Sequence, residues 1–192
     1  EGTVNYHDRG WCTFEYELTM MIKVANTSLR ADWPHVLDLG KSGVEKIRFQ
    51  RPAPAEPLAF FGGHLHGMKT YTNGADRDNI VAPKFRQTIF ELLGGVQELN
   101  FTRLGWTDEQ ACKLAVVLPL CGQLRSLEMV HNQVGNKGIR AMAAAFRNTN
   151  SQIRVLPCLT WVRLGFNSYG AGGQDALAKV LRVEGTVQSL KE

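Results

Sequence analysis

The fold of this chain is decided by one stretch, Leu124-Arg125-Ser126-Leu127-Glu128-Met129-Val130-His131-Asn132-Gln133-Val134-Gly135-Asn136-Lys137-Gly138. Apolar residues at Leu124, Leu127 and Met129 lead into an asparagine and then into two glycines. Because successive side chains of a strand point to opposite faces, the spacing of Leu127 and Met129 puts both on one side of a short strand. Apolar residues at helical spacing follow, so the stretch predicts a strand, a turn and a helix that share one core.

The same pattern recurs on both sides of this stretch, which indicates an internal repeat. It begins 28 positions earlier at Val96 and 35 positions later at Leu159. A fourth copy begins at Val187 and is cut short. The extra residues before Leu159 fall in the polar segment 147–158, which we interpret as a loop insertion between units. A single unit cannot bury its own apolar face, so the copies are expected to stack with their strands parallel.

The pattern resembles the leucine-rich repeat of the ribonuclease-inhibitor type, and the resemblance covers residues 96–192. It rests on Asn132 and Asn167, which follow the apolar strand positions, and on Gly138 and Gly173, near the predicted helix starts. It implies about three strand–helix repeats in a short solenoid with parallel strands. It also implies a buried asparagine in each unit, whose side-chain amide bonds to loop backbone.

The first copy departs from this pattern at two positions. Leu104 stands in place of the asparagine, and Gln110 stands in place of the glycine. A terminal repeat is expected to be atypical, because it has a neighbour on one side only.

Strand alternation separates an inward from an outward set of side chains. The inward set is Leu99 and Phe101, Leu127 and Met129, and Val162 and Leu164. The outward set is Glu98, Asn100 and Thr102, then Ser126, Glu128 and Val130, then Trp161, Arg163 and Gly165. Tryptophan and arginine dominate protein interfaces, and a solenoid offers an extended surface to a protein partner. The partner-binding residues that we predict are Glu98, Asn100, Glu128, Val130, Trp161 and Arg163; the alternative is that these side chains are simply solvated.

Composition sets limits on the function. The chain has 192 residues, 44% of them hydrophobic and 21% charged, which is ordinary for a globular protein. The net charge of +4 is mild and does not require a nucleic-acid partner. No apolar run is long enough to predict a membrane span. We therefore expect neither nucleic acid nor a membrane span, and the oligomeric state stays open.

Four cysteines are present: Cys12, Cys112, Cys121 and Cys158. None forms a closely spaced pair, and their wide spacing favours small buried thiols over disulfides. This pattern favours a reducing compartment, either the cytoplasm or an organelle stroma. The chain begins at Glu1 without a methionine or a signal-peptide pattern, so we interpret it as a processed form or as part of a longer product.

Residues 1–95 are predicted to form an irregular α/β region that caps the repeats of residues 96–192, so the whole chain is an α/β protein. A helix face begins at Phe14, and a buried strand is predicted over residues 36–40. A proline-rich connector follows over residues 51–57. Asp78 is a predicted helix cap. The next helix has an apolar face made of Val81, Phe85, Ile89 and Leu92 and ends at Gly94-Gly95.

A second resemblance lies in this N-terminal region. Tyr6, Arg9-Gly10-Trp11, Phe14-Glu15 and Thr72-Asn73-Gly74-Ala75-Asp76-Arg77 carry it. They resemble a region of many uncharacterised proteins of algae and other protists, dinoflagellates and haptophytes included, over roughly residues 4 to 93. The part that precedes this motif in those proteins resembles a doubly wound α/β fold, so we expect this chain to hold the second half of such a domain.

The motif region also provides the rival hypothesis, an enzyme or small-molecule binder. Arg9, Trp11 and Glu15 would line a cleft for a small molecule or nucleotide, with Glu15 as an acid or base. The structural interpretation of the same residues is a buried ion pair, from Arg9 to Glu15 or Asp76, beside an anchoring tryptophan. No catalytic set of serine, histidine and aspartate stands out, so we predict no catalytic residues, and the working hypothesis is that the chain is not an enzyme.

Metal and cofactor signals are weak. His64 and His66 are separated by one residue, but no third ligand has suitable spacing nearby. His7, Asp38 and Asp76 would have to converge on them in space. The glycines around this pair match neither a phosphate loop nor a dinucleotide fingerprint. We therefore expect neither a metal nor a cofactor.

The sequence thus predicts a protein–protein interaction module that acts as an adaptor or as a structural subunit of a larger assembly. The algal resemblance implies one concrete version, an accessory subunit docked on an organelle complex such as a photosystem. The expected partner is another protein or a multi-subunit complex.

Overall fold

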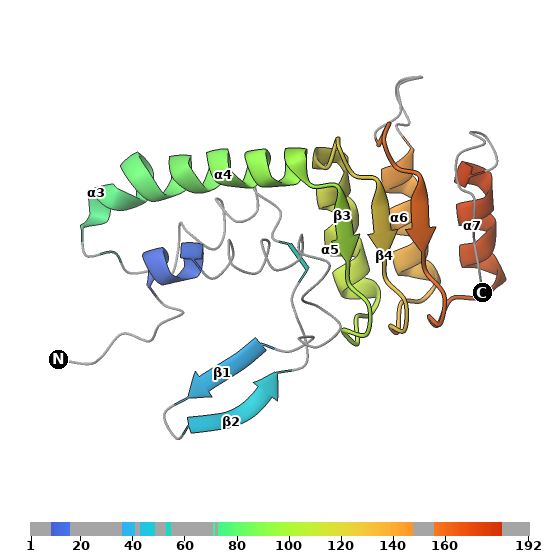
Figure 1. Cartoon of the computed structure of the whole chain (residues 1–192), viewed down its shortest axis with the longest axis horizontal. Coiled ribbons are helices and arrows are strands. Elements are labelled where there is room, and N and C mark those ends of the chain that lie inside the picture. Colours follow the sequence, from blue (N-terminus) through green and yellow to red (C-terminus); the bar gives the residue numbers. More distant parts are fainter. Residues whose placement is uncertain are drawn as a thin grey trace.

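In the computed structural model, the described residues are 9–15, 36–40, 43–48, 53–54, 71, 73–147 and 156–181. The chain is a mixed helix and strand protein with an antiparallel pair of strands and a three-stranded parallel sheet (Figure 1). The histidines His7, His64 and His66, the predicted fourth copy at Val187 and most of the proline-rich connector lie outside the described residues.

The N-terminal part contains a short helical segment at residues 10–15 and a β-hairpin. The hairpin pairs β1 (Val36–Gly40) with β2 (Gly43–Arg48), with an irregularity in register between Asp38 and Leu39. The strand predicted over residues 36–40 is confirmed. Gly10 lies against the ring of Tyr71, and a Cβ at this position would overlap that ring, so no larger residue fits here without a shift.

A continuous helical stretch leads from this part into the sheet. It comprises α3 (Gly74–Asp76), the wider π-turn η3 (Arg77–Val81) and α4 (Ala82–Gly95). The wide turn comes just before Pro83, which lacks an N–H and crowds the preceding turn of a regular helix. The prediction that Asp78 caps this helix is wrong. Asn73 caps α3 by accepting from the Ala75 N–H, whereas Asp78 lies within η3 and pairs with Arg77 at 2.8 Å.

One face of this stretch is buried. Val81, Phe85, Ile89 and Leu93 are at most 4% exposed, so the last core residue is Leu93 rather than the predicted Leu92. Phe14 of the N-terminal helical segment packs edge-on against Phe85, with ring centroids 5.7 Å apart. The helix ends at Gly95, as predicted, and the chain turns directly into the parallel sheet.

The parallel sheet consists of β3 (Glu98–Asn100), β4 (Ser126–Glu128) and β5 (Trp161–Arg163), in that order. Leu99 is in register with Leu127, and Leu127 with Val162. The prediction that the segments beginning at Val96, Leu124 and Leu159 contribute neighbouring parallel strands is confirmed.

Each strand is followed by a turn and a helix, and we call each such set a unit. The helices are α5 (Asp108–Val117) with the 3₁₀ turn η4 (Leu118–Leu120), α6 (Asn136–Phe146) and α7 (Ala171–Leu181). Helix α6 packs between α5 and α7. Figure 1 shows the strands side by side, with α5 and α6 behind them and α7 beyond β5.

The core lies between the strands and these helices. The six predicted inward residues are all at most 3% exposed: Leu99, Phe101, Leu127, Met129, Val162 and Leu164. Burial of a large apolar side chain contributes about 1.5–3 kcal/mol each, so this double row is the main stabilising feature of the sheet.

Asparagine side chains join the turns of successive units. Asn132, which is 7% exposed, accepts at Oδ1 from the N–H groups of Leu104 and Trp106, both at 3.0 Å. Its Nδ2 donates to the carbonyls of Phe101 and Met129 at 2.8 and 3.0 Å. The predicted buried amide is therefore confirmed.

Asn167 repeats this role in the next unit. It accepts from the Val134 N–H at 3.1 Å and donates to the carbonyls of Met129 and Leu164, both at 2.8 Å. Leu104 lies at the corresponding place in the first unit, where the described residues contain no earlier turn of this kind, and it is buried as an apolar residue.

Each later helix start is capped by the helix before it. Asp108, the first residue of α5, accepts at Oδ1 from the N–H groups of Gly135 and Gly138, at 2.7 and 2.8 Å. A Cβ at Gly138 would lie 2.7 Å from Val134 Cγ1 and 2.8 Å from Ala111 Cβ, so glycine permits this close approach. The predicted tight helix start at Gly138 thus has a steric reason.

The α6–α7 pair repeats the arrangement. Asn136, the first residue of α6, accepts from the N–H groups of Gly170 and Gly173, at 3.0 and 2.8 Å. Unpaired N–H groups at a helix start need an acceptor, and glycine has no side chain to supply one. Asp108 therefore replaces the missing cap of Gly135, and Asn136 replaces that of Gly170.

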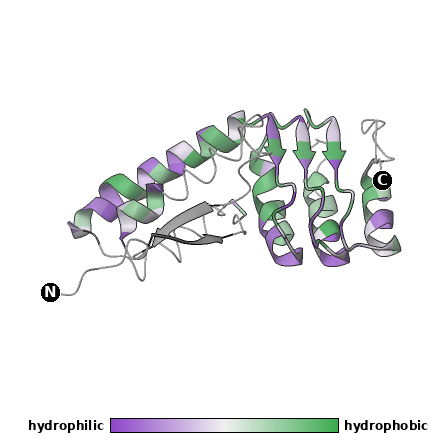
Figure 2. Ribbon diagram, turned by 60° about the horizontal axis from the view of Figure 1, so that its bottom comes forward, coloured by the Kyte–Doolittle hydropathy of each residue, from purple (hydrophilic) through white to green (hydrophobic). Residues whose placement is uncertain are grey.

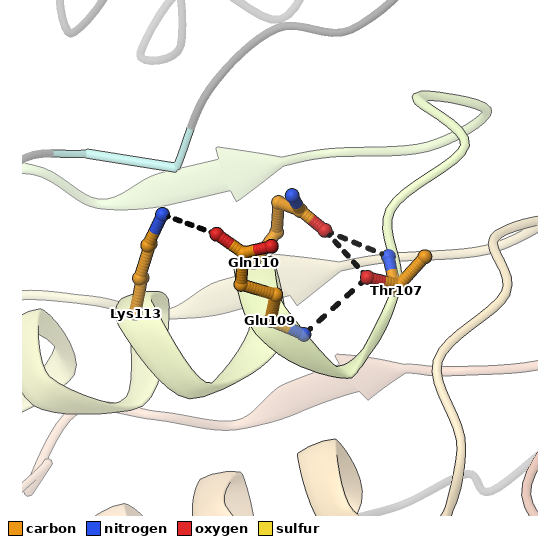
Figure 3. A network of polar contacts seen from close by, with 4 residues as sticks. All are labelled: Thr107, Glu109, Gln110 and Lys113. Carbon is orange, nitrogen blue, oxygen red and sulfur yellow. Dashed lines mark hydrogen bonds and ion pairs between the residues drawn. The ribbon is translucent and has the colours of Figure 1, made fainter.

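Helix α5 follows the first strand and caps itself instead (Figure 3). Thr107 accepts from the Glu109 N–H at 3.4 Å, and Gln110 Oε1 accepts from the Thr107 N–H at 3.0 Å. This capping box explains why the first unit has Gln110 where the others have glycine. Lys113 adds an exposed ion pair with Glu109.

Asp108→Ala is expected to lower the free energy of unfolding by about 1–2 kcal/mol, because it leaves the start of α6 without its acceptor. Urea denaturation followed by circular dichroism measures this loss. Asp108→Asn is the matched control and is expected to stay close to the parent protein, since Asn136 performs the same task one unit later. An equal loss in both variants would mean that the carboxylate charge, rather than its acceptor geometry, holds this contact.

Candidate interaction surface

The side of the sheet opposite the helices carries the predicted interaction residues. We call it the open face (Figure 2). Its strand side chains lie at alternate positions to the buried ones and are exposed or half-buried. The open face is defined by Glu98, Asn100, Ser126, Glu128, Val130, Trp161 and Arg163.

Two rows cross the open face because the strands are parallel and in register. The first row is Glu98, Ser126 and Trp161, and the second is Asn100, Glu128 and Arg163. The structure therefore brings five of the six predicted residues together on the three strands. Val130, the sixth, lies just past the end of β4 and is half-buried.

The second row is a connected set of polar side chains. Asn100 Nδ2 donates to Glu128 Oε2 at 2.9 Å, and a guanidinium nitrogen of Arg163 lies 3.5 Å from Glu128 Oε1. The side chain of Arg163 is 50% exposed, so this ion pair contributes little to stability, about 0–1 kcal/mol. These contacts place Asn100, Glu128 and Arg163 next to one another along the row.

Trp161 is the exposed large apolar side chain on the strands of the open face. It is 40% exposed and lies on β5, at the edge of the sheet among the described strands. Its neighbour in the row, Ser126, is small, which leaves the indole uncovered on that side. A partly exposed tryptophan beside an arginine is the kind of pair that concentrates binding energy in protein interfaces.

Comparison of the chain with family models, curated proteins and solved structures yields no match.

Sequence reasoning missed a second group of exposed residues, at the turns that follow the three strands. Arg103, His131 and Phe166 all have left-handed backbone, with φ of 59°, 56° and 54°. Each precedes the position held by Leu104, Asn132 or Asn167, so they are equivalent in the three units. We call these three residues the rim.

The rim is unusual because none of its residues is glycine. Left-handed backbone costs an ordinary L-residue about 1–2 kcal/mol, and it is rarest for bulky side chains such as that of Phe166. Phe166 is also 67% exposed, and its ring stacks on that of His131, with centroids 4.3 Å apart and an interplanar angle of 12°. Apolar patterning gives no information on backbone dihedrals, so the only available signal was the place of these residues immediately before the asparagine slot.

The alternative site near Arg9, Trp11 and Glu15 has a different geometry from the buried pair considered above. Arg9 and Glu15 are both exposed, and among the described residues no ion pair joins Arg9 to Glu15 or to Asp76. Trp11 is 37% exposed and packs edge-on to Phe14, with ring centroids 6.1 Å apart. The interpretation as a buried ion pair is therefore wrong, whereas the anchoring role of Trp11 stays a prediction. These side chains face outward because the buried positions of this segment belong to Gly10 and Thr13.

The thiols are all free: Cys12, Cys112, Cys121 and Cys158. Cys121 is fully buried, and burial raises the pKa of its thiol to about 12, which keeps it protonated and unreactive. Within the described ranges, no three histidine, cysteine, aspartate or glutamate side chains gather in a way that would hold a metal ion. In the same ranges, none of the helices has the length and apolar character that crossing a membrane requires.

Proposed function

We propose that the three units are leucine-rich repeats of the ribonuclease-inhibitor type, stacked as a short solenoid over residues 96–192, and that the open face binds another protein. The repeat proposal is supported by the equivalence of the paired strands, of the bonding side chains Asn132 and Asn167, and of the close helix starts at Gly138 and Gly173. Equivalent positions do equivalent work in successive units, as expected of copies of one module.

The observation that carries the binding proposal is the pairing of Trp161 with an oriented Arg163 on the open face. Arg163 lies 3.5 Å from Glu128, which accepts a hydrogen bond from Asn100, so the guanidinium is biased toward one side of the row before a partner docks. An exposed indole beside a positioned guanidinium provides both apolar area and a directional donor. No such pair is needed for stability, since the core lies on the other side of the sheet.

We propose that the protein acts through this face as an adaptor or as a structural subunit of a larger assembly. The algal motif of residues 4–93 supports one version, an accessory subunit docked on an organelle complex such as a photosystem. In that version the open face would remain the docking surface, with a protein partner rather than a small ligand.

Trp161→Ala and Arg163→Ala are each expected to abolish co-purification of the partner with the variant protein. Each substitution removes a principal contact of the open face and leaves the core intact. Co-purification from native source material with mass-spectrometric identification measures this. Phe90→Ala is the matched control, since Phe90 is an equally exposed aromatic, 40% against 40% for Trp161, on helix α4. Retention of the same partner by both open-face variants would remove this face from consideration.

A further inference from the structure

The backbone of the rim is part of the joined turns: the Arg103 N–H donates to the Val130 carbonyl at 2.9 Å, and the His131 N–H donates to the Gly165 carbonyl at 3.2 Å. Three equivalent turns hold left-handed backbone without using glycine, which adopts it freely. At Phe166 the strained backbone also presents a large apolar ring to solvent, 67% exposed. The hydrogen bonds of the turns account for the left-handed backbone but not for the choice of side chain, so a large exposed ring at such a position is a reason to look for a function of that side chain.

The rim is a short row made of two rings, those of His131 and Phe166, and one guanidinium, that of Arg103. Phe166 and His131 are stacked, and stacking covers one face of each ring, so the high exposure of Phe166 leaves its other face open. Arg103 lies on the turn after β3 and is exposed. Because neighbouring strands are about 4.8 Å apart, the turns that carry Arg103 and Phe166 are separated by roughly 10 Å.

The charge of the rim has one sign. The three turns, residues 102–107, 130–135 and 165–170, contain no aspartate or glutamate. The next carboxylate along the chain, Asp108, is occupied by the N–H groups of Gly135 and Gly138. Arg103 is always charged, so the rim is complementary to an acidic group.

We propose that the rim anchors an acidic segment of a protein partner, whose carboxylate pairs with Arg103 while an aromatic side chain packs on the open face of Phe166. This inference depends on the proposed function, because it names the chemistry of the partner. An extended peptide advances about 3.3 Å per residue, so the acidic and the aromatic residue are about three positions apart. A nucleic acid fits less well, because it carries a charge on every nucleotide and its further phosphates would meet Glu98 and Glu128 on the adjoining open face, whereas a single carboxylate needs only Arg103.

The test is a selection of random peptides displayed on phage against the immobilised full chain. Enrichment of peptides with aspartate or glutamate about three residues from an aromatic residue is expected. The best of these peptides, labelled with fluorescein, is then titrated by anisotropy against the variants. Phe166→Gly and Arg103→Gly are expected to weaken its binding by about tenfold or more. Both variants should melt at or above the temperature of the parent chain, because glycine relieves the left-handed backbone.

Phe90→Ala is the control for the loss of an exposed ring and is expected to bind the peptide as the parent does. Enrichment of basic peptides, of peptides without aromatic residues or of none would overturn the proposal. So would unchanged affinity in the two glycine variants, or binding of a single-stranded oligonucleotide in preference to the acidic peptides. Peptide binding that depends on Trp161 but not on Phe166 would reject the rim and keep the open face, whereas binding that depends on neither rejects both.

Discussion

Leu127→Asp is expected to unfold the three-stranded sheet together with its helices. Leu127 is fully buried on β4, the middle strand, with Leu99 and Val162 as its neighbours in register. The substitution removes about 1.5–3 kcal/mol of apolar burial. It also places a carboxylate where no partner is available, which adds several kcal/mol. The total, more than about 5 kcal/mol, is comparable to the whole stability of an ordinary domain.

Thermal unfolding followed by circular dichroism gives the readout, with loss of the cooperative transition expected. Arg125→Asp is the matched control, because it introduces the same side chain two positions earlier at an exposed site. That variant should melt within a few degrees of the parent chain. A normal transition in Leu127→Asp would mean that β4 does not present this residue to the core, and the strand register would be wrong.

Asn132→Leu is expected to lower the free energy of unfolding by about 4 kcal/mol, although leucine has the same number and branching of side-chain heavy atoms as asparagine. The amide of Asn132 satisfies the N–H groups of Leu104 and Trp106 and the carbonyls of Phe101 and Met129. Each buried backbone group left without a partner costs about 1–3 kcal/mol. Leu104 occupies the position equivalent to Asn132 in the first unit, where the described residues contain no preceding turn to hydrogen-bond. Leucine is therefore tolerated at this position when no backbone groups of a preceding turn depend on it.

Chemical denaturation of Asn132→Leu and Asn167→Leu side by side measures the effect. Asn167 accepts from one N–H group, that of Val134, and it is only half-buried, so its replacement should cost roughly half as much. Equal and small losses at both positions would show that water replaces the amide readily. The asparagines would then be unnecessary for joining the turns.

The sequence was sufficient to predict the strands and the core of the second half of the chain. Two-residue apolar spacing identifies Leu127 and Met129 as inward, and copies of one pattern place the strands side by side. The asparagine slot was also predictable, because an asparagine in a fixed place between a strand and a helix has few other uses. The same alternation predicted which side chains occupy the open face.

The contacts between units were not predictable in the same way. Asp108 looks like an ordinary acidic residue in the first turn of α5, and only the packing of α5 on α6 reveals that it caps the next helix. Asp78 was predicted as a cap because aspartate commonly has that role, yet Asn73 lies at the true helix start. The left-handed turns at His131 and Phe166 depend on dihedral angles, about which residue type says little unless glycine is present.

The capping of α6 by Asp108 and of α7 by Asn136 gives the second half of the chain a polarity. Every helix start after the first borrows its acceptor from the preceding neighbour, whereas α5 is self-sufficient through Thr107 and Gln110. Loss of α7 would leave the N–H groups at the starts of α5 and α6 with their acceptors. Loss of α5 would remove Asp108, the acceptor for the start of α6. Growth of the stack is therefore favoured in the direction of the chain, because each formed helix already carries the acceptor that the next helix start needs.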